Sequence, residues 1–472
     1  LAPDDLVRPH IERYVQMGLS YPAILKHLKG HFDTAQYGLS LRTLKARCRT
    51  WGIERARGQG HTLQSIAPAI ERARERFPNQ GMRDMRNTLR VEEGMEVSEK
   101  KINSYMHLHH AEEVESRRYT RGSMVRARFW TAGVNDMWTL DQHDKWRSYH
   151  LYLHVGLEPY SGYILWLKIW WTNRNPRLVA SYYLDAVESV QGMPLITQSD
   201  RGTENNGVAN AQTVMRHRLD PTLSNTLQHR WMGHKHNIKP EQFWSQLRKR
   251  WSPGFEKLLK IGVDTGLYDS EDYLDRMTFF YIFIPFLQAE LDTFRFRYNT
   301  TTKRRDPNKV LPEGKPSLIF EEPNVYSAED YRLVIDPALV SEVRQLYAPP
   351  DDPVFELVPP DFMRLADEIY TTMGSPAVSH NSAWVVYTEL LTRLRAILDA
   401  GEAQHEVSTG PLEHTERSGF QGEPMPVLNY PPARGGAVIG DLSTLASAED
   451  GYSSDGSADE QIVAPSFTGR SE

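Results

Sequence analysis

Apolar and polar positions alternate along three short segments in the middle of the chain, a period typical of β-strands. The segments are residues 136–142, 149–156 and 162–170. In the first of them Met137 and Asp141 would lie on the same face of the strand. Because hairpin-sized gaps separate the segments, they predict an antiparallel meander.

Helical spacing then takes over and alternates with further strand-like segments. Residues 175–191 and 206–217 predict helices on either side of a buried strand that ends at Asp200. Residues 226–231 predict a fifth strand, and residues 240–251 a helix that begins with a proline in its first turn. The pattern predicts an α/β fold with a mixed five-stranded sheet flanked by helices.

The front of the chain has helical spacing only. Residues 1–60 contain three such segments, and the third begins at the N-cap candidate Ser40 and is rich in basic residues. This order predicts a helix-turn-helix-like module, although a small helical bundle with a solvated basic face remains the alternative. Residues 61–116 repeat the theme and predict a second DNA-binding-like helical module. The basic side chains of the third segment that we expect to contact DNA are Arg42, Lys45 and Arg49.

C-terminal to the sheet-forming region the pattern is helical again, and the last part of the chain has no regular pattern. Residues 252–320 are mainly helical and are expected to extend a core that spans 134–320. Residues 321–400 contain two amphipathic stretches, around Ala338 to Leu346 and Ala383 to Leu398. Residues 401–472 are rich in serine, glycine, proline and acids, which predicts a disordered tail.

Charge is unevenly distributed along the chain. The whole chain carries a net charge of −6, but residues 401–472 hold 12 acids and 3 arginines, a net of −9, which leaves +3 for the rest. Residues 1–130 have 23 basic and 15 acidic side chains, a net of +8. A basic front half predicts DNA as a partner, and the acidic tail is a candidate site for binding other proteins.

Residues 117–133 form a basic linker between the helical modules and the sheet. Its first twelve residues, RRYTRGSMVRAR, contain five arginines and no acid. Two interpretations stay open, a solvated linker and an extended arm that lies along DNA phosphates. In the second interpretation Arg117, Arg118 and Arg121 contact DNA.

Several classes of protein are disfavoured by composition. Cys48 is the only cysteine, which excludes disulfides within the chain and suits a reducing compartment. No apolar run reaches the roughly 18 residues needed to span a bilayer, so no membrane partner is expected. The first residues lack a basic segment followed by an apolar one, so secretion is not expected either.

The first candidate catalytic residue is Asp200, at the end of the buried strand. Burying a carboxylate there costs free energy unless the carboxylate is paired or holds a metal ion. Two further acids are candidates to share such an ion, Asp141 on the first strand and Glu241 at the start of a helix. Each also has a structural alternative: Asp144 lies close to Asp141, Glu204 lies close to Asp200, and Glu241 suits the first turn of any helix.

These acids stand within motifs that follow one another in a specific order. They are WTLD at the first strand, SDRGTEN after Pro194 to Ile196, and Asn237, Glu241 and Trp244 at a helix start. QAELDTFRFRYN and PEGKP follow. In this order the segment resembles the catalytic core of DDE integrases, the retroviral, retrotransposon and host-derived members of the ribonuclease H-like superfamily.

The resemblance implies an enzyme, a polynucleotidyl transferase that cleaves DNA and joins strands. Asp141 would bridge two Mg²⁺ or Mn²⁺ ions, with Asp200 and Glu241 as the terminal ligands. The 40 residues between Asp200 and Glu241 exceed the usual interval of the family and imply a small insertion around residues 216–232. The lone cysteine excludes the zinc domain with two histidines and two cysteines that precedes the core in retroviral integrases.

Helix geometry around Glu241 adds DNA contacts to these expectations. Glu241, Ser245 and Arg248 share one face, so Arg248 would point at DNA bound over the ions, while Trp244 and Leu247 would face the core. Lys239 and Lys249 are the further DNA-binding candidates here.

Three functions compete: an integrase or transposase, a catalytically silent DNA-binding scaffold, and a nuclease without strand joining. For the first we expect a homo-oligomer on DNA and a nuclear location.

Overall fold

The computed structural model describes residues 1–112, 129–232, 237–303 and 311–399. Arg117, Arg118 and Arg121 of the predicted linker and the predicted acidic tail 401–472 lie outside the described residues. No helix in the described part of the chain is long and apolar enough to cross a membrane.

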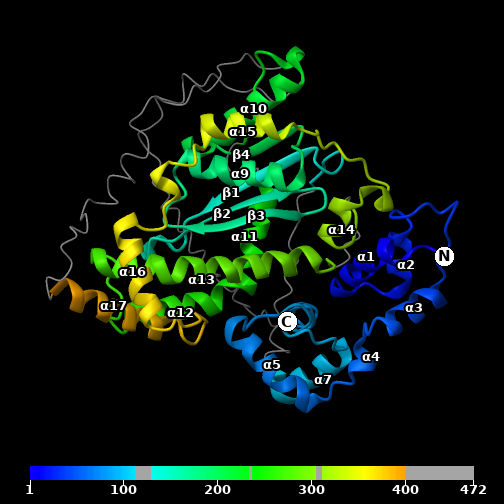
Figure 1. The fold of residues 1–472 in the computed structure, drawn as a ribbon, viewed down its shortest axis with the longest axis horizontal. Coiled ribbons are helices and arrows are strands. Elements are labelled where there is room, and N and C mark those ends of the chain that lie inside the picture. The colour runs from blue at the N-terminus through cyan, green and yellow to red at the C-terminus, as the bar shows by residue number, and fades with distance from the viewer. Residues whose placement is uncertain (113–128, 233–236, 304–310, 400–472) are drawn as a thin grey trace, which may run out of the picture.

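A five-stranded mixed sheet forms the centre of the molecule, as the alternation predicts (Figure 1). Its order is β3-β2-β1-β4-β5. The first three strands are antiparallel neighbours, and β4 and β5 add parallel to β1. The strands are β1 (Met137–His143), β2 (Tyr152–Glu158), β3 (Tyr163–Trp170), β4 (Ile196–Asp200) and β5 (His229–Met232).

Helices cover the sheet in two groups, which confirms the predicted α/β class. In one group α9 (Pro176–Val190) and α10 (Asn206–Leu219) pack on each other and on α15 (Pro337–Tyr347). In the other, α11 (Ile238–Arg250) lies against β1 and β2, and α13 (Tyr273–Thr300) lies against β3.

Gly207, in the first turn of α10, permits the close approach of the first group, because a Cβ there would lie 2.3 Å from the Pro176 carbonyl oxygen. The loop that follows Asp200 is thereby held close to α9.

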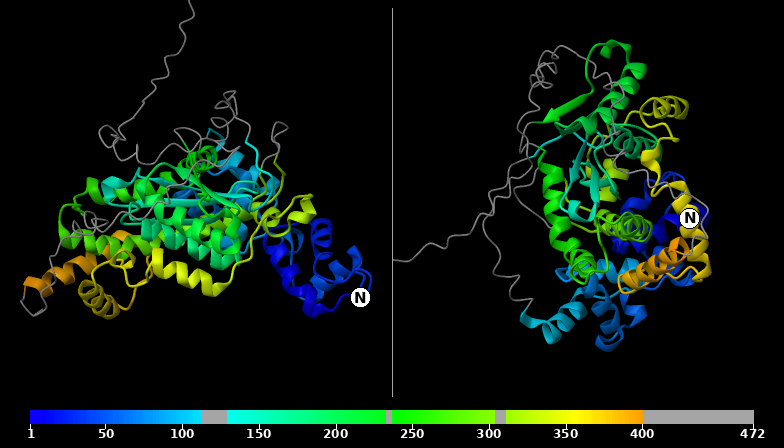
Figure 2. Two further views of the ribbon diagram at one scale, coloured as in Figure 1. Left: turned by 90° about the horizontal axis from the view of Figure 1, so that it is seen from above. Right: turned by 90° about the vertical axis from the view of Figure 1, so that its left-hand side faces the viewer.

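The remaining helices extend the same hydrophobic core. Phe362, Ala366 and Ile369 are buried at helical spacing on α16, a helix that the sequence reading did not predict. It packs against α13 and α17, at the end of the molecule away from the N-terminus (Figure 2). These helices are α12 (Ser252–Asp264), α14 (Pro316–Glu321), α16 (Pro360–Thr372) and α17 (Ala383–Asp399).

The front of the chain builds two helical units, each with a small hydrophobic core of its own. Ser40 caps the basic third helix by accepting from the Thr43 backbone N–H, as expected. The first unit comprises α1 (Asp4–Gln16), α2 (Tyr21–Leu28), α3 (Leu41–Thr50) and the short α4 (Ala56–Gln59). The second unit comprises α5 (Leu63–Arg76), α6 (Met82–Glu93) and α7 (Glu99–His109).

The first unit docks on the segment just after α14. Leu318 of α14 packs into its hydrophobic core. The Glu322 carboxylate accepts a hydrogen bond from the Tyr14 hydroxyl at 2.5 Å and contacts Nδ1 of His27 at 2.6 Å. These contacts join residues about 300 positions apart in the sequence.

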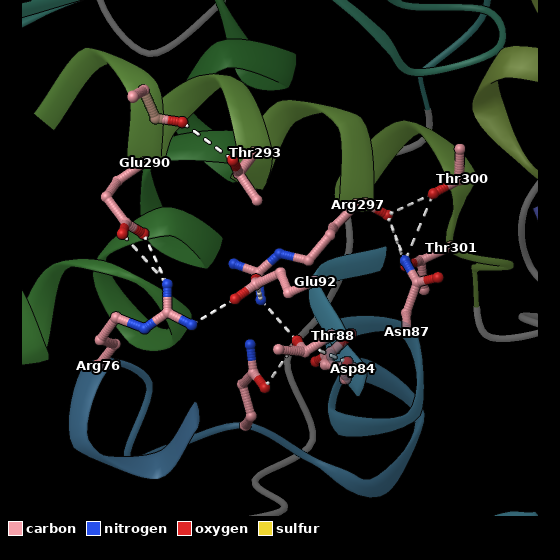
Figure 3. A network of polar contacts seen from close by, with 12 residues as sticks. Arg76, Asp84, Asn87, Thr88, Glu92, Glu290, Thr293, Arg297, Thr300 and Thr301 are labelled. Atoms are coloured by element: carbon pink, nitrogen blue, oxygen red, sulfur yellow. Dashed lines mark hydrogen bonds and ion pairs between the residues drawn. The ribbon is translucent and has the colours of Figure 1, made fainter. Parts of the chain in front are cut away.

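The second unit docks on α13 through a network of charges (Figure 3). Arg297 of α13 is almost fully buried and pairs with Glu92 of α6 at 3.1 Å. Arg76 of α5 links Glu92 to Glu290 of α13. Because a buried charge without its partner is costly, these pairs specify how the second unit sits on the core.

Candidate active site

Asp200 is the last residue of β4, and Asp141 lies two residues before the end of β1, the neighbouring parallel strand. The pairing of β1 with β4 runs from Met137 opposite Ile196 to Thr139 opposite Gln198, an offset of 59. The same offset separates Asp141 from Asp200, since 200 − 141 = 59. Side chains at matched positions of parallel strands lie on the same face of a sheet, so both carboxylates stand together at its carboxyl edge.

Helix α11 brings Glu241 to this edge. Its N-cap residue Asn237 is fully buried, and its amide donates to the Leu140 carbonyl oxygen at 2.9 Å. Trp244, seven residues on, donates its indole N–H to Oδ2 of Asp141 at 2.9 Å. Glu241 lies between these two contacts, four residues after one and three before the other, and therefore on the helix face turned toward β1.

The three acids act on one another electrostatically. Burial raises the pKa of Asp141 to about 8, and the negative charges of Asp200 and Glu241 add to the effect. Hydrogen bonds from the Trp244 indole and from the Gln142 backbone N–H act in the opposite direction. Asp141 is thus a carboxyl whose ionised form needs a compensating positive charge.

The two alternative acids are engaged by side-chain amides. Asp144, which follows β1, accepts from Asn173 at 2.6 Å. Glu204, in the loop after β4, accepts from Gln142 at 2.5 Å and from Asn205 at 3.2 Å. Burial raises the pKa of Glu204. These contacts give Asp144 and Glu204 roles in ordering the loops around the site, which favours Asp141 and Asp200 as the acids that face a ligand.

The acids do not form a closed coordination shell. Among the described residues, no three side chains of His, Cys, Asp or Glu lie close enough together to hold one metal ion as they stand. The donor set itself suits hard divalent ions, which prefer carboxylate oxygen. Glu241 is exposed and begins a helix, so it is the acid with most freedom to approach a cation.

The basic residues predicted to contact DNA have different surroundings. On α3, Arg42, Lys45 and Arg49 are exposed at spacings of three and four, which places them on one face. Arg47 points elsewhere, because it bonds to the Ala2 carbonyl oxygen and pairs with Asp4. The helix therefore presents one basic stripe, as the sequence predicts.

The candidates near the acids are less uniform. Arg248 and Lys249 of α11 are exposed. Lys239 is half-buried, with its Nζ 4.8 Å from the centre of the Phe129 ring. Arg248 also helps to lower the pKa of His143, after burial and the charge of Lys145. Arg248 and Lys145 therefore both lie near His143, two residues beyond Asp141 on β1.

Sequence reasoning missed the bond between Trp244 and Asp141. Trp244 was expected to face the core, and with 6% of its surface exposed it is indeed buried. Its indole nevertheless reaches a candidate ligand 103 residues away. The available signal was its position three residues after Glu241, which places both side chains on one face of the helix.

Comparison with known families agrees with this geometry. Residues 129–318 match the family model of the integrase core domain. No curated protein matches the chain.

Proposed function

We propose that the chain is an integrase of the ribonuclease H-like superfamily, which cleaves DNA and joins DNA strands, on the premise that residues 129–318 match the integrase core domain. The proposal rests on one observation above all. Asp141 and Asp200 occupy matched positions near the carboxyl ends of two parallel strands, and Glu241 stands on a helix that is tied to the first of them.

Asp141, Asp200 and Glu241 are the residues that would hold Mg²⁺ or Mn²⁺. When bound, such ions would supply activation of an attacking oxygen and stabilisation of the leaving oxygen. Asp141, on which the charges of both Asp200 and Glu241 act, would hold a cation together with each of them. Exposed Arg248 and Lys249 would bind the phosphates that flank the scissile bond, without base specificity.

The helical units would supply further DNA contacts. The exposed stripe of Arg42, Lys45 and Arg49 on α3 supports DNA binding by the first unit. The proposal extends to Arg117, Arg118 and Arg121, to Lys239, to a homo-oligomer assembled on DNA, and to a nuclear location.

Asp141→Asn tests the catalytic part. The exchange keeps the shape of the side chain but removes its charge, so Mg²⁺- or Mn²⁺-dependent nicking and joining of supercoiled plasmid should fall by at least about 100-fold. DNA affinity should stay within a few fold, because the basic surfaces are unchanged. The matched control is Asp144→Asn, three residues on, where the acid is engaged by Asn173; it should retain activity.

The possible outcomes separate the three functions. Loss of activity in Asp144→Asn but not in Asp141→Asn would refute the assignment. Metal-dependent nicking without joining would identify a nuclease. If the unmodified protein binds DNA but neither nicks nor joins it with either ion, a DNA-binding scaffold replaces the enzyme.

A further inference from the structure

Trp244 lies at the point where α11 meets β1. Its indole N–H donates to Oδ2 of Asp141 at 2.9 Å. Its ring stacks on His143, with the ring centres 4.8 Å apart and the planes 13° apart. On the same helix Phe243 packs against it at 5.2 Å. The indole is therefore held in one orientation by contacts from both β1 and α11.

The hydrogen bond restrains rotation of the Asp141 carboxylate. Rotation of a carboxylate about its last side-chain bond is only weakly restricted. An indole has one donor and no acceptor, so its bond to Oδ2 is the single polar interaction that Trp244 can make. The indole bond to Oδ2, together with the bond from the Gln142 backbone N–H, sets the plane of the carboxylate and so the direction in which it would meet a cation.

The same contact links two of the candidate acids. Trp244 follows Glu241 by three residues on α11, and His143 follows Asp141 by two residues on β1. The stack and the hydrogen bond therefore join the two elements beside the carboxylates themselves. A shift of α11 that moves Glu241 also moves the donor that orients Asp141.

We infer that Trp244 is a positioning residue for Asp141, which orients that carboxylate for a divalent cation and couples its orientation to the placement of Glu241. The inference rests on the proposed function, since it assumes that these acids bind cations. Residues that hydrogen-bond to a metal ligand typically change metal affinity or activity by about 10- to 100-fold when they are lost.

Two substitutions of Trp244 separate the hydrogen bond from the packing. Trp244→Phe keeps an aromatic ring against His143 but removes the N–H. Trp244→His makes the side chain smaller but retains a nitrogen, Nε2, at the place in the five-membered ring where tryptophan has Nε1, and that nitrogen can donate. Mn²⁺ affinity of the full chain is measured by electron paramagnetic resonance, together with kcat and KM for DNA nicking.

We expect Trp244→Phe to bind Mn²⁺ about tenfold more weakly and to lower kcat by a similar factor, with KM for DNA within about twofold. Trp244→His should stay within about threefold of the unmodified protein, although it removes more of the ring. A role in packing alone predicts the reverse order, with histidine the more damaging substitution.

Trp251→Phe is the matched control for the loss of an indole. Trp251 follows the last turn of the same helix and stacks on Phe255 at 4.2 Å and on Trp146 at 5.5 Å. The Trp251→Phe substitution should change the thermal midpoint of unfolding but leave the Mn²⁺ affinity unchanged.

The inference is overturned if Trp244→Phe binds Mn²⁺ as the unmodified protein does, or if Trp244→His is the weaker binder of the two. Should Trp244→Phe fail to fold, Trp244→His decides alone: retained affinity supports the inference and lost affinity overturns it. If the unmodified protein itself binds no Mn²⁺, the proposed function fails instead.

Discussion

At the scale of single residues, Asp141 carries an electrostatic cost that a cation would relieve. Burial and the charges of Asp200 and Glu241 raise its pKa to about 8. In the absence of divalent ions, Asp141→Asn should therefore stabilise the protein at neutral pH, by about 1 to 3 kcal/mol. The amide oxygen of asparagine can still accept the Trp244 hydrogen bond. The measurement is urea unfolding in the presence of a chelator.

Mg²⁺ should reverse the order of the two proteins, because only the unmodified site gains stability from binding the ion. Asp361→Asn is the control, since this acid is exposed and pairs with Arg364 on the surface. Its effect should stay within about 0.5 kcal/mol with or without Mg²⁺. An Asp141→Asn protein that is less stable than the unmodified one in chelator contradicts the electrostatic account.

At the scale of elements, α3 presents a stripe of three exposed cations that is unsupported by ion pairs in the described structure. If Arg42, Lys45 and Arg49 each contact a phosphate, replacing all three by alanine should weaken duplex DNA binding. The slope of log affinity against log salt concentration should also fall by about 2 to 3, since each neutralised phosphate contributes about 0.9. Fluorescence anisotropy between roughly 50 and 200 mM salt measures both quantities.

The control for α3 removes charge from another exposed helix. Lys257→Ala with Lys260→Ala, on α12, should leave the salt slope within about 0.5 of the unmodified value. An equal fall in slope for both variants would show that overall charge, and not the stripe on α3, determines DNA affinity.

At the scale of the whole molecule, the stability of the first helical unit, docked beside α14, should depend on pH. Burial and the charge of Arg13 lower the pKa values of His10 and His31 below 6.5, whereas the Glu322 carboxylate of the docking segment acts in the opposite direction. When the unit unfolds, both histidines take up protons at ordinary pKa values. The unit is therefore most stable above about pH 6.5 and loses stability as the pH falls below it.

Glu322 contributes in a different pH range. Although burial opposes the effect, hydrogen bonds from His27 and Tyr14 lower its pKa, so its contribution is present above about pH 4.5 and is lost only below it. The change between pH 7 and 5.5 is thus assigned to the histidines. The groups around them are Arg13, Tyr14, His27, Glu322 and Tyr326.

Hydrogen exchange of residues 4–28 measures the stability of this unit. Protection should fall severalfold between pH 7 and 5.5, after correction for the intrinsic pH dependence of exchange. A His10→Gln, His31→Gln protein should show little change over the same range, whereas Glu322→Gln should be less protected at both pH values. A double histidine variant as pH-sensitive as the unmodified protein would contradict the assignment.

The sequence by itself determined the elements of the core and their order. Alternation at period two located β1 to β3 to within about three residues, and helical spacing located α9, α10 and α11, because both periods reflect which face of an element is buried. The end of an apolar run placed Asp200 at a strand terminus, and alternation placed Asp141 on the same face of β1 as Met137. These are local properties, which depend on a few neighbouring residues.

Only the tertiary structure decided which distant residues meet. Charged residues such as Arg297 and Glu322 suggest solvent exposure when read alone, and only folding brings each beside its partners from another part of the chain. The same holds for Trp244, whose apolar ring explains its burial but whose single N–H finds Asp141 only once α11 packs on β1. Such pairings depend on how elements dock. The period of a segment shows which of its faces is buried, but not which other element covers that face.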